Sequence, residues 1–244
     1  MRPTLARNVR LPNTLTILVL IAAAFGFAAV WDRPVGVPGF WASVAAIVGV
    51  VLWQRFNAGA ASKRWLARAS NRPLVLAPPF PDTWWVSDGG PDPRHNHHLG
   101  LSDQYFAYEF LRESGDSWDQ PILAPCDGMI AHVESRQEDA PPAQRQRNQK
   151  RPFGNYVSIE TPRGYVILAH LKQGSVNVRV GESVRAGDEI GRSGNSGTTR
   201  GAHLHVHAQD QPSQAIGSAN GVPVAFFTRG SAEPLLLEYR DRLG

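Results

Sequence analysis

The stretch GAHLHVH at residues 201–207 places three imidazoles at alternate positions of a short apolar run. In a β-strand alternate side chains point to the same face, so the three histidines would share one face while Leu204 and Val206 point to the other. Histidine is the commonest metal ligand in proteins and a general base near neutral pH. The stretch therefore predicts either the solvated polar face of an amphipathic strand or a strand that carries metal ligands.

The chain after about residue 84 has the pattern of short runs and turns that is typical of a β protein. Short β-rich runs alternate there with Gly, Pro and Asp turns, and no long segment has a helical period. The runs are residues 104–110, 128–134, 155–160, 165–171, 175–178 and 202–208. The pattern predicts a mainly β fold, an antiparallel sheet or sandwich. Residues 139–152, DAPPAQRQRNQKRP, have no apolar residue other than Ala and Pro, which predicts a mobile surface loop.

Two apolar runs precede this β region. Residues 15–31 and 35–53 contain no charged side chain, and only a short Asp-Arg-Pro segment separates them. A helix needs ~20 apolar residues to cross a bilayer, so the two runs predict a hairpin of two transmembrane helices over residues 15–53. A cleavable signal peptide over the first run is the alternative, with the preceding arginines as its basic region.

Basic residues flank the two runs on their outer sides. They are Arg2, Arg7 and Arg10 before the first run, and Arg55, Lys63, Arg64 and Arg68 after the second. By the positive-inside rule both ends of the hairpin belong in the cytoplasm, although long domains can translocate regardless of such charges.

Composition narrows the chemistry of a functional site. The formal net charge of +4 is spread along the chain without a dense basic helix, so no nucleic-acid partner is expected. Cys126 is the only cysteine, which excludes an intrachain disulfide and a zinc site built from cysteines. A catalytic zinc site would instead use three His and carboxylate ligands and leave the fourth position for water.

Three further stretches carry suitable side chains. RHNHH at residues 94–98 follows a turn, Glu109 lies in the alternating aromatic run YFAYEF, and His170 lies near the end of the run at residues 165–171. Because these residues are far apart in sequence, their spacing does not show which of them would bind the metal. The residues alone therefore support only the hypothesis of a zinc hydrolase.

An ordered set of segments resembles the lysostaphin/LytM-type zinc metallopeptidases, which commonly cleave the peptide cross-bridges of peptidoglycan. The segments are LAPCDGMI (123–130), FGNYVSIE (153–160), YVILAHL (165–171), VRVGESVRAGDEIGRSGNSG (178–197) and GAHLHV (201–206). GVPVAFF (221–227) resembles a C-terminal strand of many members, and NHHLGLSDQYFAYEF (96–110) a variant opening of the family. The resemblance implies a LytM (duplicated hybrid motif) type of β fold.

The resemblance also implies roles for individual residues. His98, Glu109 and His205 would bind Zn²⁺, and His170 and His203 would be the catalytic pair that orients the water and stabilises the tetrahedral intermediate.

The chain departs from the family at two of the implied positions. Glu109 stands where the family has Asp, and His207 stands where it usually has an acid. Asp103 competes with Glu109 as the carboxylate ligand, and His97 competes with His98.

These observations predict the organisation of the whole chain. It comprises a basic N-terminal segment (1–14), a transmembrane hairpin (15–53), a juxtamembrane linker (54–83), a LytM-like metallopeptidase domain (84–230) and a C-terminal tail (231–244).

The implied function is that of a membrane-anchored zinc metallo-endopeptidase that hydrolyses peptidoglycan cross-links. Its partners would be peptidoglycan peptides and the lipid bilayer, and its catalytic domain would lie outside the cytoplasmic membrane, against the charge pattern. The alternative is a catalytically degenerate domain that binds cell wall or regulates a partner hydrolase. The change from Asp to Glu109 favours this alternative.

Overall fold

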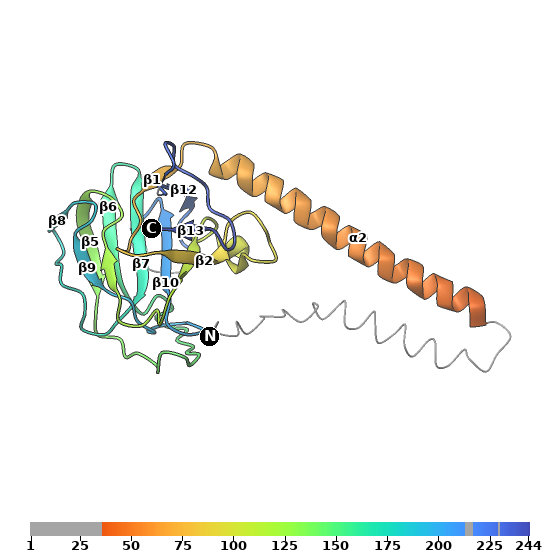
Figure 1. Ribbon diagram of the computed structural model, residues 1–244, viewed down its shortest axis with the longest axis horizontal. Coiled ribbons are helices and arrows are strands. Elements are labelled where there is room, and N and C mark those ends of the chain that lie inside the picture. Colours follow the sequence, from red (N-terminus) through yellow and green to blue (C-terminus); the bar gives the residue numbers. More distant parts are fainter. Residues whose placement is uncertain (1–35, 213–216, 229) are drawn as a thin grey trace. The chain divides into compact units, whose positions relative to one another are not determined.

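The computed structural model describes residues 36–212, 217–228 and 230–244 (Figure 1). The first predicted transmembrane run, residues 15–31, lies outside the described residues. Contacts divide the chain into two units, Met1–Ala60 and Ala61–Gly244. Helix α2 (Gly36–Ala69) runs across this boundary, and its last turns belong to the second unit, where Trp65 and Ala69 are fully buried.

The part of the chain that the structure describes contains no helix with both the length and the apolar character to cross a membrane.

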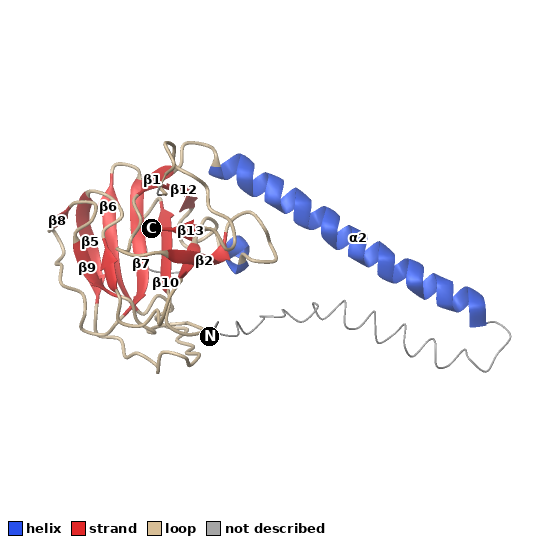
Figure 2. Cartoon of the chain, viewed as in Figure 1, coloured by secondary structure: helices blue, strands red, loops and turns tan. Residues whose placement is uncertain are grey.

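The second unit is built on a nine-stranded sheet in which every pair is antiparallel (Figure 2). In spatial order the strands are β13 (Arg242–Leu243), β2 (Trp84–Gly89), β3 (Tyr108–Arg112), β10 (Leu204–Gln209), β7 (Gly164–Leu171), β6 (Asn155–Thr161), β5 (Gly128–Glu134) and β8 (Ser183–Val184), with β11 (Gly221–Val222) paired to β10. The predicted mainly β, antiparallel fold is therefore confirmed.

Two small two-stranded sheets and a short helix complete the described part of this unit. Strand β1 (Leu74–Leu76) pairs in parallel with β12 (Val224–Phe226), and β4 (Pro121–Leu123) pairs with β9 (Glu189–Arg192). A short 3-10 helix, η1 (His97–Gly100), follows β2. The predicted strand at residues 175–178 is wrong because that segment is irregular, and the strand predicted from residue 104 begins at Tyr108.

The two faces of the main sheet differ in chemistry, as the alternation along β10 predicts. Leu204 and Val206 are fully buried in the main core, together with side chains such as Trp84 and Phe110. Burying an aliphatic or aromatic side chain of this size contributes roughly 1.5–3 kcal/mol, so this face stabilises the sheet. The histidines of β10 occupy the opposite face.

The loop at residues 139–152 is fixed to the turn that precedes β10, in contrast to the predicted mobility. Asn195 donates hydrogen bonds from Nδ2 to the carbonyls of Ala140, Pro141 and Gln144, at 2.8–3.3 Å. The backbones of Gln146 and Thr199 form a further bridge. The loop is thus ordered by its polar contacts even though it has few apolar side chains.

Candidate metal centre

Directly paired residues form a row across the main sheet. Asp88 on β2 pairs with Glu109 on β3, Glu109 pairs with His205 on β10, and His205 pairs with Ala169 on β7. Directly opposite residues of antiparallel strands share a face and lie within ~5.5 Å of each other. The register therefore places Glu109 beside His205, although they are far apart in sequence.

The segment before η1 positions His98 at this row. The Asn96 side chain accepts a hydrogen bond from the backbone N–H of His98 (3.0 Å) and donates one to the carbonyl of Gly90 (2.6 Å). The His98 side chain points inward, and the residue is only 2% exposed. Neither of its ring nitrogens has a hydrogen-bond partner among the described residues. Because buried polar atoms are normally paired, these two nitrogens fit a metal ligand.

His98, Glu109 and His205 each offer one ligand atom, and the three atoms lie within 4.8 Å of one another. The Nε2 atom of His98 is 3.5 Å from Oε1 of Glu109. Ligands bound at about 2.1 Å to a tetrahedral zinc ion are about 3.4 Å apart. The structure thus gathers the three predicted ligands within 4.8 Å, with His98 and Glu109 at the separation that a zinc ion would impose, while the binding itself stays a prediction.

A hydrogen-bonded chain along β10 determines which nitrogen His205 offers. Gln209 donates from Nε2 to the carbonyl of Gln211 (2.7 Å), so its Oε1 accepts from Nε2 of His207 (3.1 Å). In the neutral ring, Nδ1 of His207 then accepts from Nε2 of His205 (2.9 Å). The Nδ1 atom of His205 therefore keeps its lone pair and is the nitrogen that is available to a metal ion. His207 orients His205 in the way that hydrogen-bond partners orient metal-binding histidines.

His170 reaches the same face through a β-bulge. Tyr156 of β6 pairs with Ala169 and the preceding Asn155 pairs with Leu171, so His170 is the extra residue and has φ of 64°. A bulge re-aims a side chain that strict alternation would send to the other face. The His170 ring consequently lies 4.7 Å from that of His203, between ring centroids.

The two rings of this pair are held in the same tautomer. Nδ1 of His170 is 2.9 Å from the carbonyl of Ser196, and Nδ1 of His203 is 2.8 Å from the carbonyl of Gly201. Since a carbonyl can only accept, both Nδ1 atoms carry the proton and both Nε2 atoms hold a lone pair when neutral. Burial, followed by the charge of His203, lowers the pKa of His170 to about 3, so that ring is neutral at pH 7.

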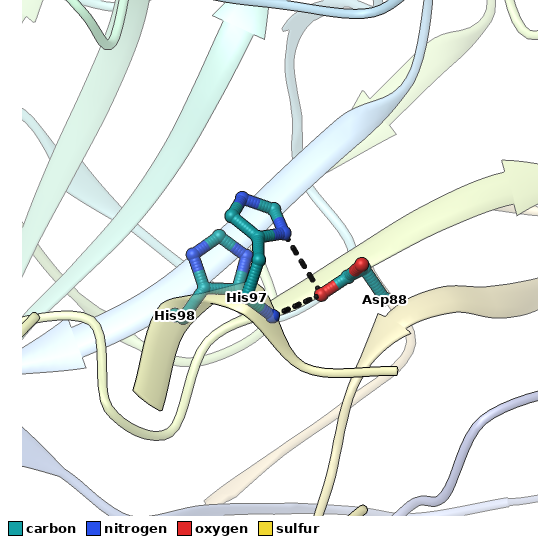
Figure 3. A group of neighbouring side chains, drawn as sticks. All are labelled: Asp88, His97 and His98. Carbon is teal, nitrogen blue, oxygen red and sulfur yellow. Dashed lines mark hydrogen bonds and ion pairs between the residues drawn. The ribbon is translucent and has the colours of Figure 1, made fainter. Parts of the chain in front are cut away.

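Asp88 and His97 add contacts that the sequence did not predict (Figure 3). Oδ1 of Asp88 accepts from the backbone N–H of His97 (2.8 Å) and lies 2.9 Å from its Nδ1. The ring of His97 is thereby held with Nε2 3.5 Å from Oε1 of Glu109. Asp88, His97 and His98 form a second group whose ligand atoms lie within 4.8 Å of one another. Burial lowers the pKa of His97, but the Asp88 hydrogen bond and Glu109 raise it by more.

The Glu109 carboxylate is the electrostatic centre of the site. The Nε2 atoms of His97, His98 and His203 lie 3.5, 3.5 and 3.7 Å from its Oε1. Burial would raise the pKa of Glu109, but the neighbouring imidazoles, His203 foremost, lower it well below its usual range. Glu109 is therefore an anion at neutral pH and suits a cation as a ligand.

Asp103, the competing carboxylate, does not join either group of ligand atoms among the described residues. It is 1% exposed, and both of its carboxylate oxygens lack a hydrogen-bond partner within the described part of the chain. Its charge acts on His207 instead, although burial dominates there and lowers the pKa of His207 to about 4.

Two buried histidines and a partly buried carboxylate, beside two imidazoles with available Nε2 atoms, form a set of side chains that suits a metal-dependent hydrolase. Residues 115–218 match the family model of Peptidase family M23. The resemblance to lysostaphin/LytM-type peptidases is thereby confirmed. The match includes His170, His203 and His205, whereas His98 and Glu109 precede it.

Two curated proteins and one solved structure extend the comparison. The chain is 28% identical over 137 residues to an "Uncharacterized metalloprotease" of Buchnera aphidicola subsp. Baizongia pistaciae, covering 56% of this chain and 31% of that protein. It is 31% identical over 86 residues to an "Uncharacterized metalloprotease" of Haemophilus influenzae, covering 35% and 15%. The chain thus spans less than a third of either relative. The catalytic domain of the prophage-encoded M23 protein EnpA from Enterococcus faecalis is 20% identical, with coverage of 60% and 92% and a TM-score of 0.40.

Proposed function

We propose that this chain is a membrane-anchored zinc metallo-endopeptidase that hydrolyses peptide bonds in peptidoglycan cross-links. The observation that carries the proposal is the gathering of His98, Glu109 and His205 ligand atoms within 4.8 Å beside the His170–His203 pair. The match of residues 115–218 to Peptidase family M23 supports peptidase chemistry, and the metalloprotease names of the curated relatives support a metal.

The donor chemistry favours zinc. Two imidazole nitrogens and one carboxylate oxygen, with no thiolate, are the ligands of many catalytic zinc sites. His98, Glu109 and Nδ1 of His205 would hold the ion. When bound, zinc polarises the scissile carbonyl and lowers the pKa of its water toward ~7.

The imidazoles of the protein would carry out the proton transfers of the reaction. Nε2 of His170 or His203 accepts the proton of the attacking water, because both Nδ1 protons are committed to backbone carbonyls. The other ring stabilises the oxyanion of the tetrahedral intermediate when its own Nε2 is protonated, and the ring that took up the proton of the water returns it to the leaving amine. The carbonyls of Ser196 and Gly201 keep both rings in position.

Cleavage and metal content test this proposal. The purified full-length protein in detergent is incubated with zinc and peptidoglycan, and mass spectrometry measures new amino termini and bound metal. We expect one zinc per chain and cleavage of cross-links, both absent in His98→Ala. Less than stoichiometric zinc together with intact cross-links would refute the enzyme and support a degenerate domain that binds wall or regulates a hydrolase.

Membrane anchoring and location are part of the same proposal. The uncharged runs at residues 15–31 and 35–53 would form the bilayer anchor, and a peptidoglycan substrate requires the catalytic domain outside the cytoplasmic membrane. A reporter that is active only outside the cytoplasm, fused after residue 244, tests this. Activity of a cytoplasmic reporter at the same place would rule out peptidoglycan as the substrate.

A further inference from the structure

A cavity of about 320 Å³ lies on the face of the sheet that carries the histidines, over β5 and β6. Its lining includes His132, Glu134, Lys150, Arg151, Phe153 and Tyr156. None of these residues belongs to the ligand groups or to the catalytic pair described above.

The floor of this cavity combines an aromatic surface with unused polar atoms. The rings of His132 and Tyr156 are stacked, with centroids 5.1 Å apart and planes at 12°. The Tyr156 hydroxyl and Nδ1 of His132 are buried, and neither has a hydrogen-bond partner in the described ranges. Because unpaired buried polar atoms are unfavourable, the floor suits a ligand that has an apolar stem and a hydrogen-bond acceptor.

The rim of the cavity carries an excess of positive charge. Arg151 pairs from one guanidinium nitrogen with Oε2 of Glu134 at 2.5 Å, and its side chain is 56% exposed. Oε1 of Glu134 accepts from the backbone N–H groups of Ser135 and Arg136. Both carboxylate oxygens are thus engaged, while Lys150 and the rest of the Arg151 fork remain to attract an anion. A guanidinium fork matches a carboxylate in geometry as well as charge.

The cavity is connected to the candidate metal centre by strand register. His205 pairs with Ala169, Ala169 pairs with Tyr156, and Tyr156 pairs with Glu134. Neighbouring strands are ~4.8 Å apart, so Tyr156 lies ~10 Å from His205 along this row. An extended peptide covers that distance with about three residues. The Phe153 ring lies between the two places, with its centroid 6.0 Å from Tyr156 and 6.3 Å from His205.

We propose that this cavity binds a carboxylate-bearing residue of the peptide substrate, about three residues from the scissile bond. The apolar stem of that residue packs on Tyr156 and His132, the Tyr156 hydroxyl donates a hydrogen bond to its carboxylate, and Arg151 pairs with the charge. This inference rests on the proposed peptidase function for the identity of the ligand as a peptide.

The test compares two peptides that differ only in the proposed group. A fluorescent tetrapeptide of peptidoglycan-stem sequence with a free terminal carboxylate, and the same peptide as the carboxamide, are titrated into the full-length protein in detergent. The background is His203→Ala, so that neither peptide is turned over. We expect the acid to bind about tenfold more tightly than the amide, as for a hydrogen bond to a charged group.

Three variants and one control locate the effect. Tyr156→Phe and Arg151→Gln should each remove most of the preference for the acid, whereas Glu134→Gln should tighten acid binding because it removes the competing charge. The control is Arg147→Gln, which removes a basic side chain from the same loop outside this cavity and should leave the preference unchanged.

Equal affinity for acid and amide, no binding of either at millimolar concentration, or an unchanged preference in the first two variants would overturn the proposal. A preference for the acid in a protein whose wild type cleaves no cross-links would refute the peptidase and retain the carboxylate site.

Discussion

Replacing Glu109 with Asp, the usual family residue, should weaken rather than strengthen metal binding. Oε1 of Glu109 is 3.5 Å from Nε2 of His98, close to the ~3.4 Å separation of ligands on a tetrahedral zinc ion. Removing one methylene withdraws the carboxylate by ~1.5 Å, which lengthens this distance to about 5 Å. The carboxylate could then reach the ion only if β3 moved, and β3 is hydrogen-bonded on both sides, to β2 and β10. We expect at least a tenfold loss of affinity, ~1.4 kcal/mol.

The assay is zinc competition against a chromophoric chelator, with the full-length protein in detergent. Glu109→Gln is the matched control, since it keeps the length of the side chain, loses the negative charge and should bind zinc more weakly still. Thermal unfolding of the metal-free variants verifies that the sheet is intact. If Glu109→Asp bound zinc as tightly as the wild type at an unchanged Tm, the site would tolerate either carboxylate and the distance argument would be refuted.

Three further predictions concern catalysis, folding and pH. His203→Ala should lower cross-link cleavage by about 10²–10⁴ while zinc content stays the same, and loss of zinc in this variant would make His203 a ligand. Gly154→Ala should destabilise the domain by about 3 kcal/mol or more, because Gly154 has φ of 61° and a Cβ would lie 2.4 Å from the backbone carbon of Ser196; a Tm within a few degrees of the wild type would contradict this. In the metal-free protein, His170 and His207 have folded pKa values of about 3 and about 4, below the ~6.5 of an unfolded histidine. Below pH ~6.5 the unfolded state therefore binds more protons than the folded state. The stability that these two neutral histidines contribute is complete above that pH, and the free energy of unfolding should fall toward pH ~4 by up to ~1.4 kcal/mol per pH unit for each histidine. Urea midpoints that do not change over this range would disprove this prediction.

Local patterns in the sequence were sufficient to predict which side chains of a single strand face the core. Alternation along residues 203–207 predicts that Leu204 and Val206 enter the core while the histidines share the other face, and both parts agree with the structure. The resemblance of the ordered segments to the family predicted Glu109 and His205 as ligands. Only the pairing of β3 with β10 shows that these two residues are neighbours. That pairing is a long-range property that no local pattern encodes.

Irregularities of the sheet account for what could not be predicted. By alternation, His170 would follow Leu168 into the core, yet the bulge opposite Asn155 and Tyr156 turns it toward the metal centre. A second register shift, between Val86 and Asp88, brings Asp88 opposite Glu109. Each bulge depends on how two strands meet, so propensities along one strand contain no signal for it.

Both bulges serve the same row of the sheet, and this row relates the metal centre to the cavity. From Asp88 through Glu109 and His205, paired residues continue across β7 to Tyr156 and Glu134. A peptide that crosses the strands along this row would meet the metal ligands and the carboxylate cavity in turn. The two bulges therefore bring Asp88 and His170 to the same face of the sheet as the candidate metal ligands and the cavity.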